Sequence, residues 1–170
     1  MYLVAFLIRT YGMAQADTPF PLAVVGIGAM LGSLLGGYLA GQRYRLTSAA
    51  IALLLGGGCV GVALTISLSP WTAIILCCAS ALFLTTFEPV TWALAAEFAG
   101  EARATANGLL ATSNQLGIIG GASVGGVVLA LGDFPLVGLF CMSAAAVAAA
   151  IVTALKLRIA RTPRVETRAA

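Results

Sequence analysis

The chain has 170 residues, of which 61% are hydrophobic and only 9% are charged, and its mean hydropathy is +1.04. A soluble domain of this length could not bury so much apolar surface, so we expect much of it to face lipid. The net charge of +3 is small and gives no indication of a nucleic-acid partner. The sequence contains no His, which excludes a His-ligated zinc or haem site and a Ser/His protease as self-contained activities.

Five apolar stretches are long enough to cross a membrane, since about 20 residues span about 30 Å of hydrocarbon in a helix. They do not alternate between apolar and polar residues as barrel strands do, so their backbone groups must be satisfied within helices. We therefore predict an all-α fold, a polytopic transmembrane helical bundle. The expected spans are residues 20–41, 47–68, 71–96, 104–131 and 135–155.

Residues 1–13 hold an apolar run of about half the length that a membrane span requires. A signal peptide would begin with basic residues, whereas Arg9 follows the apolar run here. We expect this segment to be a truncated transmembrane helix, with the chain beginning partway through a helix or at an internal start codon.

Basic residues occur in alternate connections between the spans. Arg43 and Arg45 follow the first span, Arg103 follows the third, and residues 156–170 form a basic tail. The other connections carry Asp17, Asp133 or no charge, apart from Arg9. The positive-inside bias predicts a multi-pass protein of the inner or plasma membrane with a cytoplasmic C-terminus.

Cofactor and enzyme chemistry have little support in the sequence. The four cysteines lie inside apolar spans without a Cys-x-x-Cys pair, which is typical of packing residues. No glycine-rich loop with Lys and Ser or Thr is present, so ATP hydrolysis is not indicated. With no nucleophile and base pair and no metal cluster, we expect no cofactor, no metal and no enzymatic activity.

Glycines recur at four-residue intervals in two of the spans. Small residues at this spacing let helix backbones approach closely in a membrane. They are compatible with simple helix association or with the moving interface of a transporter, and the spacing alone leaves both open. The first stripe consists of Gly28, Gly32 and Gly36, and the second of Gly117, Gly121 and Gly125, with Gly108 and Gly126 beside it.

Two sequence motifs, at residues 37–45 and 108–126, resemble motifs of the major facilitator superfamily and occur in the same order. Residues 37–45 are similar to its loop motif Gly-x-Leu-Ala-Asp-Arg-x-Gly-Arg, with Gly41, Gln42 and Tyr44 replacing Asp, Arg and Gly. Residues 108–126 resemble the antiporter motif of its drug exporters, with Ala122 replacing Pro. The resemblance covers essentially the whole chain and implies helix packing or gating roles for the glycines and a cytoplasmic anchoring role for Arg43, Arg45 and Arg103.

In this family two six-helix halves share a related plan, so the motifs alone fit either half. The span 71–96 lacks the intramembrane Arg typical of the N-terminal half, and the chain ends in a basic tail. The resemblance therefore implies a C-terminal half, with residues 1–13 as the remnant of helix 7. The alternative is an N-terminal half.

Glu88 is the charged residue that the sequence singles out. A carboxylate within a membrane span is costly unless it faces a cavity or a partner, or binds a proton. Pro89 follows it and favours a kink. At helical spacing Thr85, Glu88 and Trp92 share one face, which predicts a cavity wall that binds a cation or a proton. Alternatively, Glu88 is simply hydrated or paired with another part of the protein.

Polar residues of the span 104–131 are secondary candidates. Asn114 is the main one, and Asn107 and Gln115 accompany it. Their side chains either line the cavity or form hydrogen bonds between helices.

Three functional classes compete. The leading prediction is proton-coupled efflux of a small molecule by a secondary transporter, to which this chain contributes one half. Its partners would be the lipid bilayer, the substrate, H⁺, and a missing half or a second copy. An accessory or assembly subunit, or an inactive transporter fragment, is the alternative, and a membrane-embedded enzyme is disfavoured.

Overall fold

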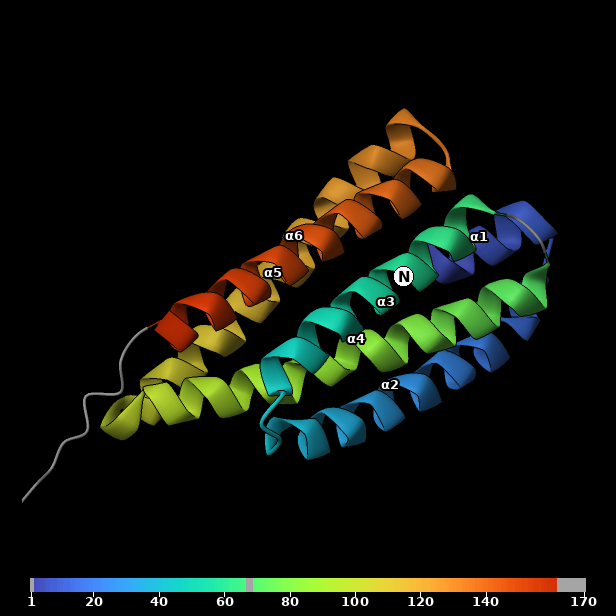
Figure 1. Ribbon diagram of the computed structural model, residues 1–170. Coiled ribbons are helices and arrows are strands. Elements are labelled where there is room, and N and C mark those ends of the chain that lie inside the picture. The colour runs from blue at the N-terminus through green and yellow to red at the C-terminus, as the bar shows by residue number, and fades with distance from the viewer. Residues whose placement is uncertain (1, 67–68, 162–170) are drawn as a thin grey trace, which may run out of the picture.

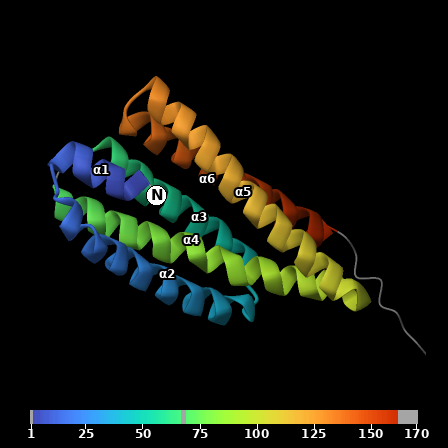
Figure 2. The same cartoon turned by 180° about the vertical axis from the view of Figure 1, so that it is seen from behind.

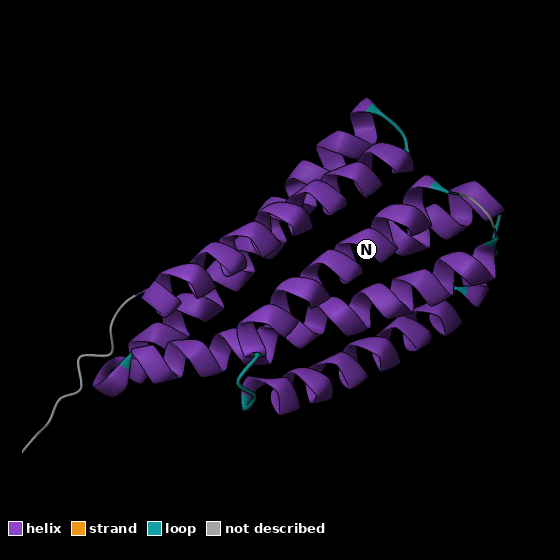
Figure 3. Ribbon diagram, viewed as in Figure 1, coloured by secondary structure: helices purple, strands orange, loops and turns teal. Residues whose placement is uncertain are grey.

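The computed structural model describes residues 2–66 and 69–161, and these residues form helices joined by short connections (Figure 3). No strand occurs in the described parts of the chain. The α-helices are α1 (Tyr2–Tyr11), α2 (Pro19–Ala40), α3 (Arg45–Thr65), α4 (Pro70–Phe98), α5 (Arg103–Leu131) and α6 (Phe134–Arg161), with 3-10 turns η1 (Gln15–Asp17) and η2 (Gly100–Ala102). Among the helices in the described ranges, five, all except α1, are long and apolar enough to cross a membrane.

Most helix bounds lie within three residues of those expected from the sequence, but α6 differs. It continues to Arg161, so residues 156–161 are helical rather than part of a tail. A charged side chain does not end a helix, and no Gly or Pro interrupts this stretch. Met1, the end of the expected span 47–68 at residues 67–68, and the tail residues 162–170 lie outside the described residues.

Helix α4 lies at the centre of the bundle (Figure 1). It packs against α2 on one side and α3 on another, and α3 packs in turn against α6. Two buried clusters hold α3, α4 and α6 together. One cluster, near the start of α6, includes Phe6 and Leu7 of α1. The other, nearer the opposite end, includes Ala49 of α3 and Val90 of α4.

The first glycine stripe brings α2 into backbone contact with α4. Gly28, Gly32 and Gly36 are buried on α2. A Cβ atom at any of the three would overlap a backbone carbonyl group of α4, at Cys78, Leu82 and Thr86 respectively. Because a backbone cannot move aside as a flexible side chain can, these positions require glycine at the observed separation of the two helices.

Polar side chains of α4 reinforce this contact. The Thr86 hydroxyl lies 3.2 Å from the Gly32 carbonyl oxygen and 2.8 Å from the Leu82 oxygen of its own helix. The Cys78 thiol lies 3.3 Å from the carbonyl oxygen of Val24. Each donor can therefore bond across the interface, and such bonds replace those that water would supply outside the hydrocarbon.

Helix α5 stands apart from this packing. It runs alongside α6 in both views (Figures 1 and 2) and approaches α4 near the end of that helix, yet Gly125 is its only buried residue. Large apolar side chains along it, such as Leu116 and Ile119, are about two-thirds exposed. Most of the α5 surface is thus free to contact lipid or another protein segment.

We predict that Gly32→Ala destabilises the bundle by about 1 to 3 kcal/mol, the usual range for overpacking, because the added methyl group meets the α4 backbone. Thermal unfolding of the purified chain in nonionic detergent measures this change. Gly26→Ala, on an open part of the same helix, is the matched control and should be neutral or slightly stabilising. Equal stability of the two variants would contradict the close approach of α2 and α4.

Candidate functional site

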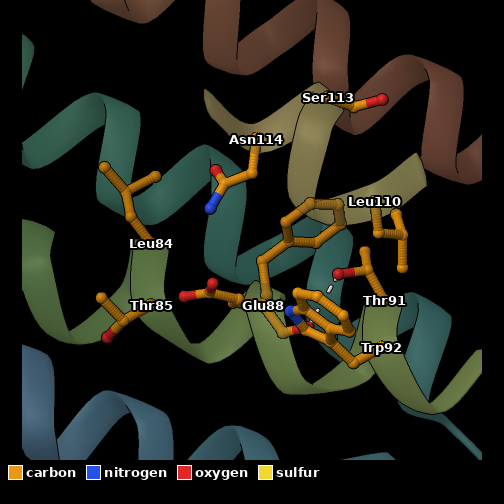
Figure 4. A pocket seen from close by; sticks show the side chains of 9 residues that line it. Leu84, Thr85, Glu88, Thr91, Trp92, Leu110, Ser113 and Asn114 are labelled. Carbon is orange, nitrogen blue, oxygen red and sulfur yellow. Dashed lines mark hydrogen bonds between the residues drawn. The ribbon is translucent and has the colours of Figure 1, made fainter. Parts of the chain in front are cut away.

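An open pocket with a volume of about 480 Å³ lies between α4 and α5 (Figure 4). This is within the range of roughly 300 to 1,000 Å³ that is common for small-molecule sites. Four residues that the sequence suggested, Glu88, Trp92, Thr85 and Asn114, all line it. The remaining lining residues are Leu84, Phe87, Thr91, Leu110 and Ser113.

Glu88 supplies the only formal charge in this lining. The residue is exposed on the α5 side of α4, and its carboxylate forms no ion pair within the described residues. The next residue, Pro89, lies inside α4 without ending the helix. The Thr91 hydroxyl donates a hydrogen bond to the carbonyl oxygen of Glu88 at 2.7 Å. The carboxylate itself remains available to a ligand.

Thr85 lines the pocket, but its hydroxyl turns away from Glu88 toward α2 (Figure 4). The hydroxyl oxygen lies 2.9 Å from the carbonyl oxygen of Ala29 and 2.8 Å from that of Ala81. Helical spacing predicts the face on which Thr85 lies but not the direction of its hydroxyl. A hydroxyl in a membrane helix commonly bonds the carbonyl oxygen four residues earlier instead of pointing into a cavity. Ala81, one helical turn before Thr85, lines a different cavity.

Helix α5 provides the opposite wall of the pocket. The Asn114 side chain extends toward α4, into the space that the Glu88 carboxylate faces (Figure 4). The Ser113 hydroxyl points away from this space, and Leu110 adds an apolar contact. Ser113 and Leu110 were not predicted from the sequence. Leu110 lies four residues before Asn114, so helical spacing places it on the same face, whereas Ser113 is only the sequence neighbour of Asn114.

The other polar candidates on α5 do not line this pocket. Gln115 is exposed, and the side-chain oxygen of Asn107 is buried without a hydrogen-bond partner in the described structure. Neither position reveals a ligand.

The second glycine stripe has a different environment from the first. A Cβ atom at Gly108, Gly117 or Gly121 would meet no neighbouring atom within 4 Å in the described structure. Gly125 is buried and Gly126 is exposed. Most of this stripe therefore forms a smooth open surface on α5 rather than a packed interface within the chain.

The predicted cytoplasmic loop residues lie at one end of the bundle. There α2 ends, α3 begins, α4 ends and α5 begins, and we call this the basic end (Figure 1). Arg43 and Arg103 are exposed, while Arg45 forms an ion pair with Glu97. Arg45 is the first residue of α3, next to the partly positive N-terminus, and Glu97 lies in the last turn of α4, next to the partly negative C-terminus. Each charge is therefore repelled by its own helix end, and the ion pair offsets both repulsions.

This arrangement predicts the effect of exchanging the two charges. Glu97→Arg should destabilise the bundle by about 1 kcal/mol, because it removes a partly exposed ion pair and places two cations together. The double variant Arg45→Glu with Glu97→Arg should be at least as stable as the original, since each charge then faces a helix end of opposite sign.

Thermal unfolding in detergent measures both effects, with Glu101→Arg as a control for charge alone, since Glu101 forms no ion pair among the described residues. A double variant that is no more stable than Glu97→Arg would contradict the pairing.

The comparisons with known proteins agree with the geometry. The family model of the Major Facilitator Superfamily matches residues 1–170. No curated protein and no solved structure matches the chain significantly. Together with the five membrane-spanning helices, the family match confirms the predicted all-α bundle, built as one half of a major-facilitator-type fold. This multi-pass membrane protein therefore belongs to the Major Facilitator Superfamily of transporters.

Proposed function

We propose that the chain forms one half, the C-terminal one, of a secondary transporter that exports a small molecule in exchange for protons. The observation that carries this proposal is the position of Glu88. It is a carboxylate within a membrane-spanning helix, unpaired in the described structure, on the wall of a pocket that also contains Trp92 and Asn114.

The chemistry of this wall supports exchange. A carboxylate can hold a proton or a positively charged group, but not both at once, so the two ligands compete for Glu88. The indole of Trp92 offers an apolar surface that attracts a cation, and the Asn114 amide can donate or accept a hydrogen bond. Glu88 would carry the proton in one direction and release it when the substrate binds.

The surroundings of the pocket support a role as one wall of a larger cavity. The pocket is open, and α5, which forms its second wall, is almost unburied within the described structure. The open part of the second glycine stripe, at Gly117 and Gly121, is suited to close contact with a second half that rocks against this one during transport. We place this second half, or another copy of the chain, on the open face of α5.

The orientation in the membrane forms part of the proposal. Several basic residues lie at the basic end of the bundle, near the helix ends of α2, α3, α5 and α6: Arg43, Arg45, Arg103, Lys156 and Arg158. By the positive-inside bias we assign this basic end to the cytoplasm and the protein to the inner or plasma membrane. The short connections of the opposite end would then face outward.

Glu88→Gln is expected to slow proton-driven efflux about tenfold or more. The amide can neither release a proton nor neutralise a cation, and a loss of about 1.4 kcal/mol in ligand binding free energy corresponds to a factor of ten. The experiment measures efflux of a panel of cationic, neutral and anionic dyes from cells that express the complete transporter, at several external pH values. The variant should also lose the dependence of the rate on pH.

Glu101→Gln is the matched control, because it removes a carboxylate that lies outside the pocket and should leave efflux unchanged. Unaltered rate and pH dependence in Glu88→Gln would overturn the role of this residue.

The chain alone is expected not to transport. Liposomes containing only this polypeptide should retain the same dyes as empty liposomes, because half of the cavity wall is missing. Adding the other half of the transporter to these liposomes should produce efflux. If this chain were only an assembly subunit, adding the other half would produce no efflux. Efflux by the chain as the only protein present, and as a monomer, would contradict the half-transporter proposal.

A further inference from the structure

A second acidic and aromatic pocket lies at the end of the bundle opposite the basic end. Its volume is about 500 Å³, and it forms where η1 and the first turn of α2 meet the first turns of α4. The lining residues are Met13, Ala16, Asp17, Pro19, Phe20, Pro21, Trp71 and Ile74. None of them lines the Glu88 pocket.

The charge of this pocket is negative. Asp17 is exposed and is the only formally charged residue in the lining. Arg9 is the nearest basic residue in the sequence, but it lines a separate pocket, together with Asp133. No ion pair of Asp17 occurs within the described structure. The carboxylate is thus free to attract a cation from outside the chain.

Two aromatic residues line the same pocket as Asp17. The rings of Phe20 and Trp71 meet edge to face, with centroids 6.0 Å apart and an interplanar angle of 76°. In this geometry the face of at least one ring is left uncovered by the other, and the two residues are 58% and 63% exposed. An aromatic ring face attracts cations, and an indole does so most strongly.

The base of the pocket is fixed. Pro21 is buried on α2 and Ile74 is buried on α4. The Thr18 hydroxyl donates to the Gln15 carbonyl oxygen at 2.8 Å and holds the turn that precedes α2. Asp17 lies within this turn, so its backbone position at the rim of the pocket is defined by the turn.

The geometry points to a binding site for a quaternary ammonium group, in which Asp17 supplies the counter-charge and Phe20 and Trp71 supply the aromatic wall. Aromatic residues at a membrane boundary commonly anchor helices in the headgroup region. Anchoring would account for the exposed rings, but it does not require an unpaired carboxylate within the same pocket. A methylated ammonium group suits this lining better than a metal ion, because its methyl groups can contact the rings, Met13 and the prolines.

The test uses tetramethylammonium as the probe and the complete chain in maltoside detergent, which contains no ammonium group. Saturation-transfer NMR detects the methyl signal of the bound probe and yields its Kd, which we expect on the order of 1 mM. Tert-butyl alcohol, similar in size but neutral, should show no saturable binding.

Substitutions at two exposed side chains test the assignment with little effect on folding. Asp17→Asn and Trp71→Leu should each raise the Kd about fivefold or more, and Trp71→Phe should raise it less. Glu101→Gln, which removes a carboxylate outside both pockets, should leave the Kd unchanged, and the dependence of the Kd on Asp17 and Trp71 separates this site from the pocket of the proposed function. Absence of saturable binding, or unchanged Kd values in both Asp17→Asn and Trp71→Leu, would overturn the proposal.

A quaternary ammonium group can come from a soluble cation or from the choline headgroup of a lipid. Nanodiscs of phosphatidylcholine and of phosphatidylglycerol distinguish these sources. Loss of the Asp17-dependent probe signal only in phosphatidylcholine identifies the headgroup as the competing ligand. An equal signal in both lipids identifies a soluble cation, and either result supports the shared chemistry.

Discussion

The close approach of the α2 and α4 backbones is the contact on which the rest of the bundle depends. In hydrocarbon an apolar side chain gains little by leaving lipid for a neighbouring helix, so association relies on short contacts and on hydrogen bonds between helices. Gly28, Gly32 and Gly36 provide the first, and the hydroxyls of Thr85 and Thr86 provide the second. This contact secures one side of α4, while its α3 side is secured by apolar packing.

Because two sides of α4 are held by packing, its third side can carry a carboxylate, which is energetically unfavourable within a membrane span. Glu88 occupies that side, facing α5, and both the residue and the pocket remain accessible. The α2 and α3 faces of α4 are thus packed, and its α5 face is accessible to a ligand. The same division separates the two glycine stripes. The first is covered by the α4 backbone, whereas a Cβ atom at Gly117 or Gly121 of the second would meet no neighbour within the described structure.

Much of this architecture could be predicted from sequence because hydrophobic length is a strong signal for membrane helices. Four candidate residues, including Glu88 and Asn114, line one pocket, although their functional roles stay predictions. Other features depend on packing that sequence spacing does not contain. The Thr85 hydroxyl turns toward α2, the Arg45 and Glu97 pair joins residues far apart in the chain, and α6 extends past the first charge of the expected tail.

The contact between Phe6 and Phe134 has a consequence for how the protein is made. These rings, 5.1 Å apart, join the first helix to the start of the last one, and both belong to one buried cluster. During synthesis α1 leaves the ribosome well before α6 exists, so this cluster stays incomplete until α6 has been translated. Consolidation of the cluster therefore follows the insertion of the helices that lie between α1 and α6.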